Sequence, residues 1–161
     1  MTPGTIELRP IREDDGPFLF RVYASTREVE RDAWQWEEEA WGAFLRMQFD
    51  AQRRHYTTHL PSAVQSVVLC EGEPAGRTWV HRSPEEIRLL DIAILPEYRR
   101  RGIGTHLIRE LQEEARRAGV PLHHSVELGN PGARRLYERL GFVAVRTRGM
   151  HTLMEWNPAD G

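Results

Sequence analysis

The chain has 161 residues, 40% of them hydrophobic and 29% charged, which predicts one soluble globular domain with a core of its own. The net charge of -2, from 22 basic and 24 acidic side chains, argues against a nucleic-acid partner or a basic membrane-binding surface. All 22 basic residues are arginine, which excludes a phosphate-binding Walker lysine and a Schiff-base lysine. Cys70 is the one cysteine, so no internal disulfide can form. Because the chain also has neither a leader-like start nor a long apolar run, we expect a cytoplasmic protein.

The first sixty residues predict one strand and two helices. Apolar and polar residues alternate over residues 6–11, which favours a strand, and residues 14–27 favour a helix. A second helix is predicted over residues 43–60, with its apolar stripe at Phe44, Met47, Ala51 and His55. Residues 29–42 lack a clean period and are expected to form a loop or short helix. In that stretch Trp34, Trp36 and Trp41 are expected in the core, and Glu37, Glu38 and Glu39 in a solvated turn. The alternative is that these carboxylates attract a cationic amine, on which the tryptophans stack.

The rest of the chain predicts three strands, then helices and strands in alternation. Short turns join expected strands at residues 64–70, 75–81 and 87–95, which is typical of an antiparallel meander. An amphipathic helix is predicted over residues 102–118, followed by a strand at 122–127. Asn130 is a good N-cap for a helix ending near Leu140, and strands at 142–146 and 152–156 close the chain. Hairpins combined with one strand–helix–strand crossover indicate an α+β fold.

The segment from Leu95 to Thr105 connects the most β-like strand with the amphipathic helix. The first amides of a helix lack internal acceptors and lie at the positive end of the helix dipole. Gly102 and Gly104 would let a ligand approach those amides, and three arginines precede them. This pattern is typical of an anion site that suits a pyrophosphate. Two alternatives stay open on these residues: a dinucleotide-binding loop, which lacks its third glycine because position 107 is Leu, and a helix start with solvated arginines.

Two motifs resemble those of the GCN5-related N-acetyltransferase (GNAT) family. The residues Arg99-Arg100-Arg101-Gly102-Ile103-Gly104 match the R/Q-x-x-G-x-G/A loop of that family. The segment from Asn130 to Phe142 resembles its second motif, N-x-x-A-x-x-L-Y-x-x-x-G-F. The resemblance covers about residues 64–157 and implies a mixed, mostly antiparallel sheet of about seven strands, splayed in the middle and flanked by about four helices. It further implies a single domain over residues 1–161, with an acceptor-pocket part at about 1–62 and an acetyl-CoA-binding core at about 63–157.

The resemblance implies acetyl-CoA as co-substrate, no metal, and direct transfer of the acetyl group to a primary amine in a ternary complex. The pantetheine arm would pair with the edge of the strand that precedes the loop, which is a form of β-augmentation. The acceptor would be a small-molecule or peptide amine, and a homodimer is possible in this fold. The expected cofactor-binding residues are Ile92, Ala93, Ile94, Arg99, Arg100, Arg101, Gly102, Ile103, Gly104, Thr105, Asn130, Ala133 and Tyr137.

The candidate catalytic residues are Tyr137, which the resemblance implies, and Asp91, which its position in the strand suggests. By its motif position, Tyr137 is the general acid for the leaving thiolate, since a phenol with a pKa of about 10 stays protonated at pH 7. Spacing alone favours Tyr137 as a helix-face aromatic packed in the core, and the motif match reverses that preference. Asp91 lies in an otherwise apolar strand and is the candidate base, with Ser125 and Glu127 as weaker candidates. The alternative for Asp91 is a hydrogen bond to a turn or an edge contact.

Other candidate sites and functions are weaker. His55 and His59 lie four apart on a predicted helix but have no third ligand, so a metal site is not expected. Cys70 is expected to be buried and inert. A non-catalytic CoA-binding module with the same fold, serving as a sensor or in assembly, is the alternative function. A nucleotide-binding α/β domain is a second alternative.

Overall fold

The structure is a computed structural model that describes residues 4–159. Residues 1–3 and 160–161 lie outside the described part. The expectation about a leader sequence concerns the N-terminus and therefore falls partly on these residues. Seven strands, five α-helices and two short 3-10 turns are found in the described residues. In chain order they are β1 (Ile6–Pro10), η1 (Glu13–Asp15), α1 (Gly16–Ser25), α2 (Glu28–Trp34), α3 (Glu38–His59), β2 (Val64–Cys70), β3 (Glu73–Arg82), β4 (Ile87–Ile94), η2 (Pro96–Tyr98), α4 (Ile103–Ala118), β5 (Leu122–Glu127), α5 (Pro131–Arg139), β6 (Val143–Arg148) and β7 (His151–Trp156).

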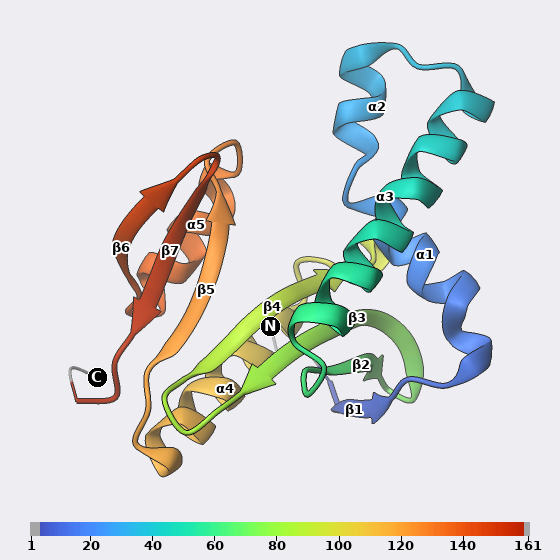
Figure 1. Cartoon of the computed structure of the whole chain (residues 1–161). Coiled ribbons are helices and arrows are strands. Elements are labelled where there is room, and N and C mark those ends of the chain that lie inside the picture. The colour runs from blue at the N-terminus through green and yellow to red at the C-terminus, as the bar shows by residue number, and fades with distance from the viewer. Residues whose placement is uncertain (1–3, 160–161) are drawn as a thin grey trace. The chain divides into compact units, whose positions relative to one another are not determined.

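The strands follow the order β1-β2-β3-β4-β5-β7-β6 (Figure 1). Of the pairings described here, β1–β2, β5–β7 and β6–β7 are antiparallel, and β4–β5 is parallel. Helix α4 makes the crossover between those two parallel strands, as such a connection requires. The α+β class and the mostly antiparallel seven-stranded sheet are therefore confirmed, whereas the expected number of about four helices falls one short of the five observed.

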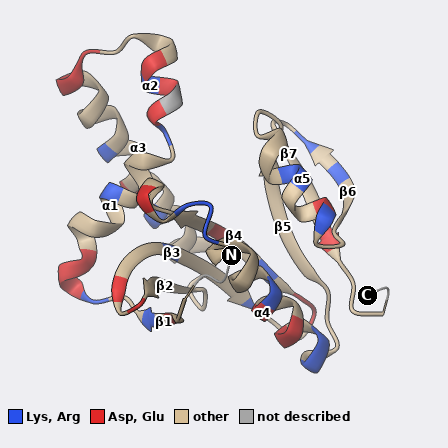
Figure 2. Ribbon diagram, turned by 180° about the vertical axis from the view of Figure 1, so that it is seen from behind, with Lys and Arg blue, Asp and Glu red and all other residues tan. Residues whose placement is uncertain are grey.

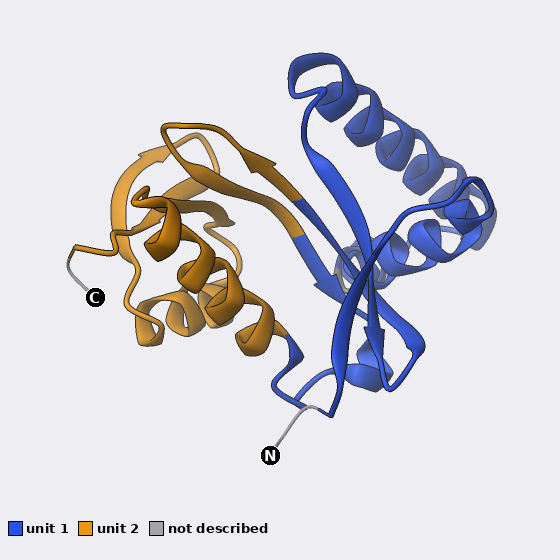
Figure 3. Ribbon diagram, turned by 90° about the horizontal axis from the view of Figure 1, so that it is seen from below, with its two compact units in different colours: residues 1–79, 92–103 blue, residues 80–91, 104–161 orange. Residues whose placement is uncertain are grey.

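The chain divides into two compact units (Figure 3). Unit 1 comprises residues 1–79 and 92–103, and unit 2 comprises residues 80–91 and 104–161. Strands β3 and β4 each contribute residues to both units. No helix within residues 4–159 combines the length and the apolar character that crossing a bilayer requires.

The core of unit 1 forms where α1 and α3 pack on β2. Its buried members are Leu19, Tyr23, Trp41, Leu45, Phe49 and Val67. The stripe predicted for α3 was wrong, because Met47 is 54% exposed and His55 is exposed. The helix begins five residues earlier than expected, and the buried positions Trp41, Leu45 and Phe49 recur every four residues on another face.

The segment before α3 also differs from the prediction. Residues 28–34 form α2, and Gln35 then adopts a left-handed conformation with φ 53°, which ends that helix. Glu38 and Glu39 lie in the first turn of α3 rather than in a solvated turn, where carboxylates favour the positive end of the helix dipole. Trp34 is 57% exposed, so the expected core position was wrong for Trp34 and right for Trp41.

The core of unit 2 lies between α4, α5 and one face of the strands β5 and β7. The predicted stripe of α4 is confirmed, since Ile103, Leu107, Leu111 and Ala115 are all buried. On the strands, Leu122, Val126, Thr152, Met154 and Trp156 are buried at alternate positions. The residues between them point to the opposite face, because successive side chains of a strand alternate. The Gln112 side chain donates to the Leu140 carbonyl (2.8 Å) and so connects α4 with the end of α5.

Candidate active site

A tight turn leads from β4 into α4. The backbone folds back through η2, where the Tyr98 amide donates to the Leu95 carbonyl (2.9 Å) and the Arg99 amide to the Pro96 carbonyl (3.2 Å). Arg100 and Gly102 both adopt left-handed conformations, with φ 63° and 81°. This conformation is natural for glycine but costs energy at an arginine. The motif glycine at position 102 is therefore a conformational requirement of the turn.

The three arginines of this turn have different environments. The Arg99 Nε donates to the Ile94 carbonyl (2.9 Å). The Arg101 guanidinium donates to the Glu97 carbonyl (3.0 Å) and lies 5.1 Å from the centre of the Tyr98 ring. Arg100 is exposed, and within residues 4–159 no carboxylate pairs with it. The turn thus holds two guanidiniums against its own backbone and leaves the third directed to solvent.

The second half of β4 is held firmly in unit 1. Ala93 and Leu95 are buried against Val22 of α1. The Leu95 amide donates to the Ala75 carbonyl of β3 (2.8 Å), whereas the Ile94 carbonyl is satisfied by a side chain rather than by a strand. At Gly76 of β3, a Cβ would lie 2.2 Å from the Ala93 carbonyl oxygen, so only glycine allows β3 this close to β4.

In unit 2, the buried Tyr137 of α5 packs against two rings. Its ring centre lies 4.8 Å from that of His124 on β5 and 5.2 Å from that of Phe142, the latter in an edge-to-face arrangement. The His124 Nδ1 lies 2.8 Å from the Leu89 carbonyl oxygen. Because a carbonyl can only accept, Nδ1 carries the proton and Nε2 of the neutral ring keeps a lone pair. His124 and Leu89 are also partners in the β4–β5 ladder.

Burial and a nearby carboxylate change the acid–base properties of this cluster. Burial, followed by the negative charge of Asp91, raises the pKa of the Tyr137 phenol well above its ordinary value. Burial lowers the pKa of His124, although the Leu89 carbonyl and Asp91 partly oppose that shift. At neutral pH the cluster therefore contains a protonated phenol and a neutral imidazole.

The second motif folds as a capped helix. The Asn130 side chain accepts from the Ala133 amide (3.1 Å), and Pro131 occupies the first turn of α5. The predicted N-cap is confirmed. Asn130 and Ala133 are thus bonded to each other, and this cap fixes where α5 begins. At Gly104, near the start of α4, a Cβ would meet nothing within 4 Å, so the space beside that glycine is open.

Unit 2 thus brings the two predicted catalytic residues, Asp91 and Tyr137, within electrostatic reach of each other. Sequence reasoning missed His124 as a member of this cluster. A signal was available: His124 lies between Leu122 and Val126 in the strand alternation, and so belongs to the buried face. Ser125 and Glu127, the weaker base candidates, lie at exposed positions of β5.

His55, His59 and Cys70 are the other candidates from the sequence. Within the described residues, no group of three or more His, Cys, Asp or Glu side chains is placed to hold a metal ion. His55 and His59 contact each other through their rings, whose centres are 4.6 Å apart. Cys70 is buried, as predicted.

A family model described as "Acetyltransferase (GNAT) family" matches residues 17–142. The chain belongs to the GNAT family. A curated relative, the ribosomal protein bS18-alanine N-acetyltransferase of Escherichia coli K12, is 41% identical to this GNAT chain over 59 residues, which are 36% of the chain. The matched region spans 40% of that relative's length.

Solved structures show the same fold as this GNAT chain. A PaiA N-acetyltransferase from Thermoplasma acidophilum, in complex with coenzyme A, superposes with a TM-score of 0.72 at 20% identity, covering 95% of this chain and 99% of the other. A spermidine N-acetyltransferase chimera that includes the Vibrio cholerae protein gives a TM-score of 0.61 at 20% identity, covering 96% of each chain. The fold expected from the two motifs is confirmed.

Proposed function

We propose that this GNAT protein transfers the acetyl group of acetyl-CoA to a primary amine. The observation that carries the proposal is the arginine turn between β4 and α4, which matches the family loop and has the left-handed Gly102 that such a turn needs. Bound acetyl-CoA would supply an electrophilic thioester carbon. The acceptor amine would supply the nucleophile, and residues of this chain would handle the protons.

The turn suits the diphosphate of acetyl-CoA. Arg100 carries an exposed positive charge with no described carboxylate partner. The amides from Arg101 to Thr105 include the first amides of α4, which have no acceptor within the helix. The open space beside Gly104 would admit an oxyanion to those amides. Arg99 and Arg101 would hold the turn in shape through their backbone bonds and add positive charge to it.

The pantetheine arm would bind along β4. Its amides can bond only to backbone groups that β3 leaves free. Leu95 bonds β3, and the Ala93 carbonyl oxygen lies toward Gly76 of β3. We therefore assign the pairing to Ile92 and Ile94, with Arg99 releasing the Ile94 carbonyl or sharing it with the arm. Ala93 would support this part of the strand without itself bonding the pantetheine arm, because its carbonyl oxygen lies toward β3.

Tyr137 would hold the proton that the departing thiolate needs. The raised pKa of its phenol keeps Oη protonated throughout the neutral range, which suits a donor and not a base. The His124 ring fixes one face of the phenol. Asp91 is the proposed acceptor for the proton of the attacking amine, either directly or through water, because its carboxylate lies near both rings.

Two measurements test this proposal. Release of free thiol from acetyl-CoA is followed across a panel of amines, and coenzyme A binding is measured by calorimetry for wild type, R100E and the exposed control R109E on α4. A reversed charge at the turn should weaken binding about tenfold or more, while R109E binds as wild type. Absence of coenzyme A binding would overturn the proposal. So would a thermal melt in which ATP or NAD raises the melting temperature and acetyl-CoA does not. Binding without turnover of any amine would favour the non-catalytic alternative.

A further inference from the structure

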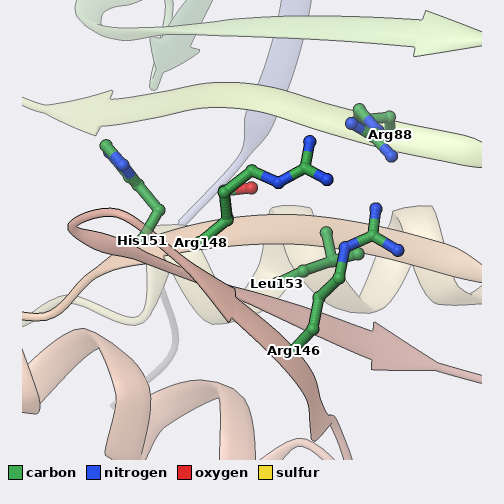
Figure 4. A pocket seen from close by; sticks show the side chains of 6 residues that line it. Arg88, Arg146, Arg148, His151 and Leu153 are labelled. Atoms are coloured by element: carbon green, nitrogen blue, oxygen red, sulfur yellow. The ribbon is translucent and has the colours of Figure 1, made fainter.

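Unit 2 contains a cavity of about 360 Å³ on the sheet face opposite to α5 (Figure 4). It is lined by Arg88 of β4, Ser125 of β5, Arg146 and Arg148 of β6, and His151 and Leu153 of β7. These side chains converge because the ladders align them: Ser125 pairs with Leu153, Leu153 with Arg146, and His151 with Arg148. Apart from Ser125, a weaker candidate for the base, the sequence motifs assign these residues no role.

The cavity carries positive charge that the protein itself does not neutralise. Within residues 4–159, neither Arg146 nor Arg148 has an ion-pair or side-chain hydrogen-bond partner. Arg88 pairs with Glu86 (3.1 Å), but that carboxylate also lies 2.9 Å from the His123 Nδ1. Figure 2 shows the basic colouring along β6. Arg146 and Arg148, which have no described ion-pair partner, repel each other across the hollow, and a bound oxyanion would relieve that repulsion.

Two further carboxylates, those of Glu127 and Glu155, lie on this face outside the cavity lining. Glu155 lies 2.8 Å from the His123 Nε2, so His123 lies between Glu86 and Glu155. Glu127 is the ladder partner of His151 and lies at an exposed position. Neither Glu127 nor Glu155 lines the cavity. The lining itself therefore offers guanidinium, imidazole and hydroxyl groups, which can all donate to an oxyanion.

The cavity lies across the strands from the proposed catalytic cluster of the same unit. The β4–β5 ladder runs from Ile87–Leu122 to Leu89–His124. Ser125, which lines the cavity, directly follows His124, which contacts Tyr137, so these two side chains point to opposite faces of β5. Arg88 and Asp91 are three residues apart on β4 and likewise point to opposite faces. A molecule anchored in the cavity would therefore reach Asp91 and His124 past the end of this ladder, at Leu89 and His124.

We propose that this cavity binds an oxyanion group of the acceptor, so that the substrates are amines that also carry a carboxylate or a phosphate. The inference rests on the proposed function, because it specifies the acceptor of that reaction. Arg146 and Arg148 would hold the oxyanion in a charge-assisted, bidentate manner, and Ser125 and His151 would add neutral donors. Polyamines would be repelled, in contrast to the spermidine named for one structural neighbour.

Matched pairs of acceptors test the inference. β-Alanine is compared with β-alaninamide, and phosphoethanolamine with ethanolamine, so that the two pairs distinguish a carboxylate from a phosphate. In at least one pair, kcat/KM should be about tenfold or more higher for the anionic member. The R146Q/R148Q double variant should bring that ratio close to one, and R109Q should preserve it. Equal rates within both pairs, a ratio that survives R146Q/R148Q, or a preference for spermidine would each overturn the inference.

A binding measurement separates this inference from the proposed function. Inorganic phosphate is titrated into the protein while the arginine Nε–Hε signals are followed by NMR. Shifts should appear on Arg88, Arg146 and Arg148, besides any at the Arg99–Arg101 turn. The shift of Arg88 should disappear in the double variant, whose changed side chains are exposed and whose fold a thermal melt verifies. If no amine is acetylated, the proposed function fails and this titration decides the cavity alone. Absence of those shifts would overturn the site.

Discussion

Replacing Tyr137 by phenylalanine removes one hydroxyl group and leaves the ring in place. The contacts with His124 and Phe142, at 4.8 Å and 5.2 Å between ring centres, belong to the ring and persist in Y137F. We therefore expect the free energy of unfolding to change by no more than about 1 kcal/mol. An alanine at the same position would instead leave a cavity costing about 3–5 kcal/mol, so only Y137F separates chemistry from folding.

The catalytic effect of Y137F should be far larger than its effect on stability. Removal of a positioned general acid lowers kcat by about 10²–10⁴-fold. This range corresponds to about 2.7–5.4 kcal/mol in the activation barrier. The assay follows free coenzyme A thiol at saturating acetyl-CoA, with whichever amine of the panel wild type acetylates. Y56F is the matched control, since Tyr56 lies on α3 in unit 1 and packs on Trp79.

The pH dependence supplies a second test of the same reasoning. Even at its ordinary pKa of about 10, a phenol would be less than about one-tenth ionised at pH 9, and burial raises the pKa of Tyr137 further. The ratio of wild-type to Y137F kcat should therefore stay constant from about pH 6 to pH 9. A kcat within twofold of wild type, or a ratio that collapses inside this range, would refute the assignment of Tyr137 as the acid.

Three further predictions concern stability. D15N should lower the free energy of unfolding by about 1–3 kcal/mol in urea titrations at pH 7, because the Asp15 carboxylate accepts two bonds from Arg9, at 2.8 Å and 2.9 Å. Arg9 lowers the pKa of Asp15, so this contribution is present above the ordinary value of about 4 and disappears as the pH falls below it. G76A should destabilise by about 1–3 kcal/mol through the clash with β4, whereas G42A on α3 should stabilise by about 0.5–1 kcal/mol. Because burial lowers the pKa of His124, wild type should lose stability as the pH falls below about 6.5, and H124N should lose less over that range.

Each stability prediction has a control variant and an outcome that would contradict it. D14N changes an exposed carboxylate in the same 3-10 turn and should cost less than D15N; equal losses would mean that the Arg9 pair contributes nothing specific. A stabilising G76A would mean that β3 and β4 can separate without cost. For His124, the control is H59N at the exposed end of α3, and an acid loss that is the same in H124N as in wild type would assign the titration to other groups.

The sequence alone determined those elements whose signals are local. Helix α4 could be predicted because apolar residues recur every four positions from Ile103 to Ala115 and Gly119 ends the pattern. The start of α5 was readable because Asn130 and Pro131 are a cap and a first-turn residue whatever surrounds them. The turn from Arg99 to Gly104 was likewise visible, since its arginines and glycines are adjacent in the sequence.

Only the tertiary structure decided which of several possible faces is buried. Helix α3 offers more than one apolar stripe, and packing against α1 and β2 selected Trp41, Leu45 and Phe49 over the stripe with Met47. The contact between His124 and Tyr137, and the convergence of Arg88 with Arg146, join residues that are distant in sequence. Strand register sets both arrangements, and register depends on long-range pairing and not on the composition of any one segment.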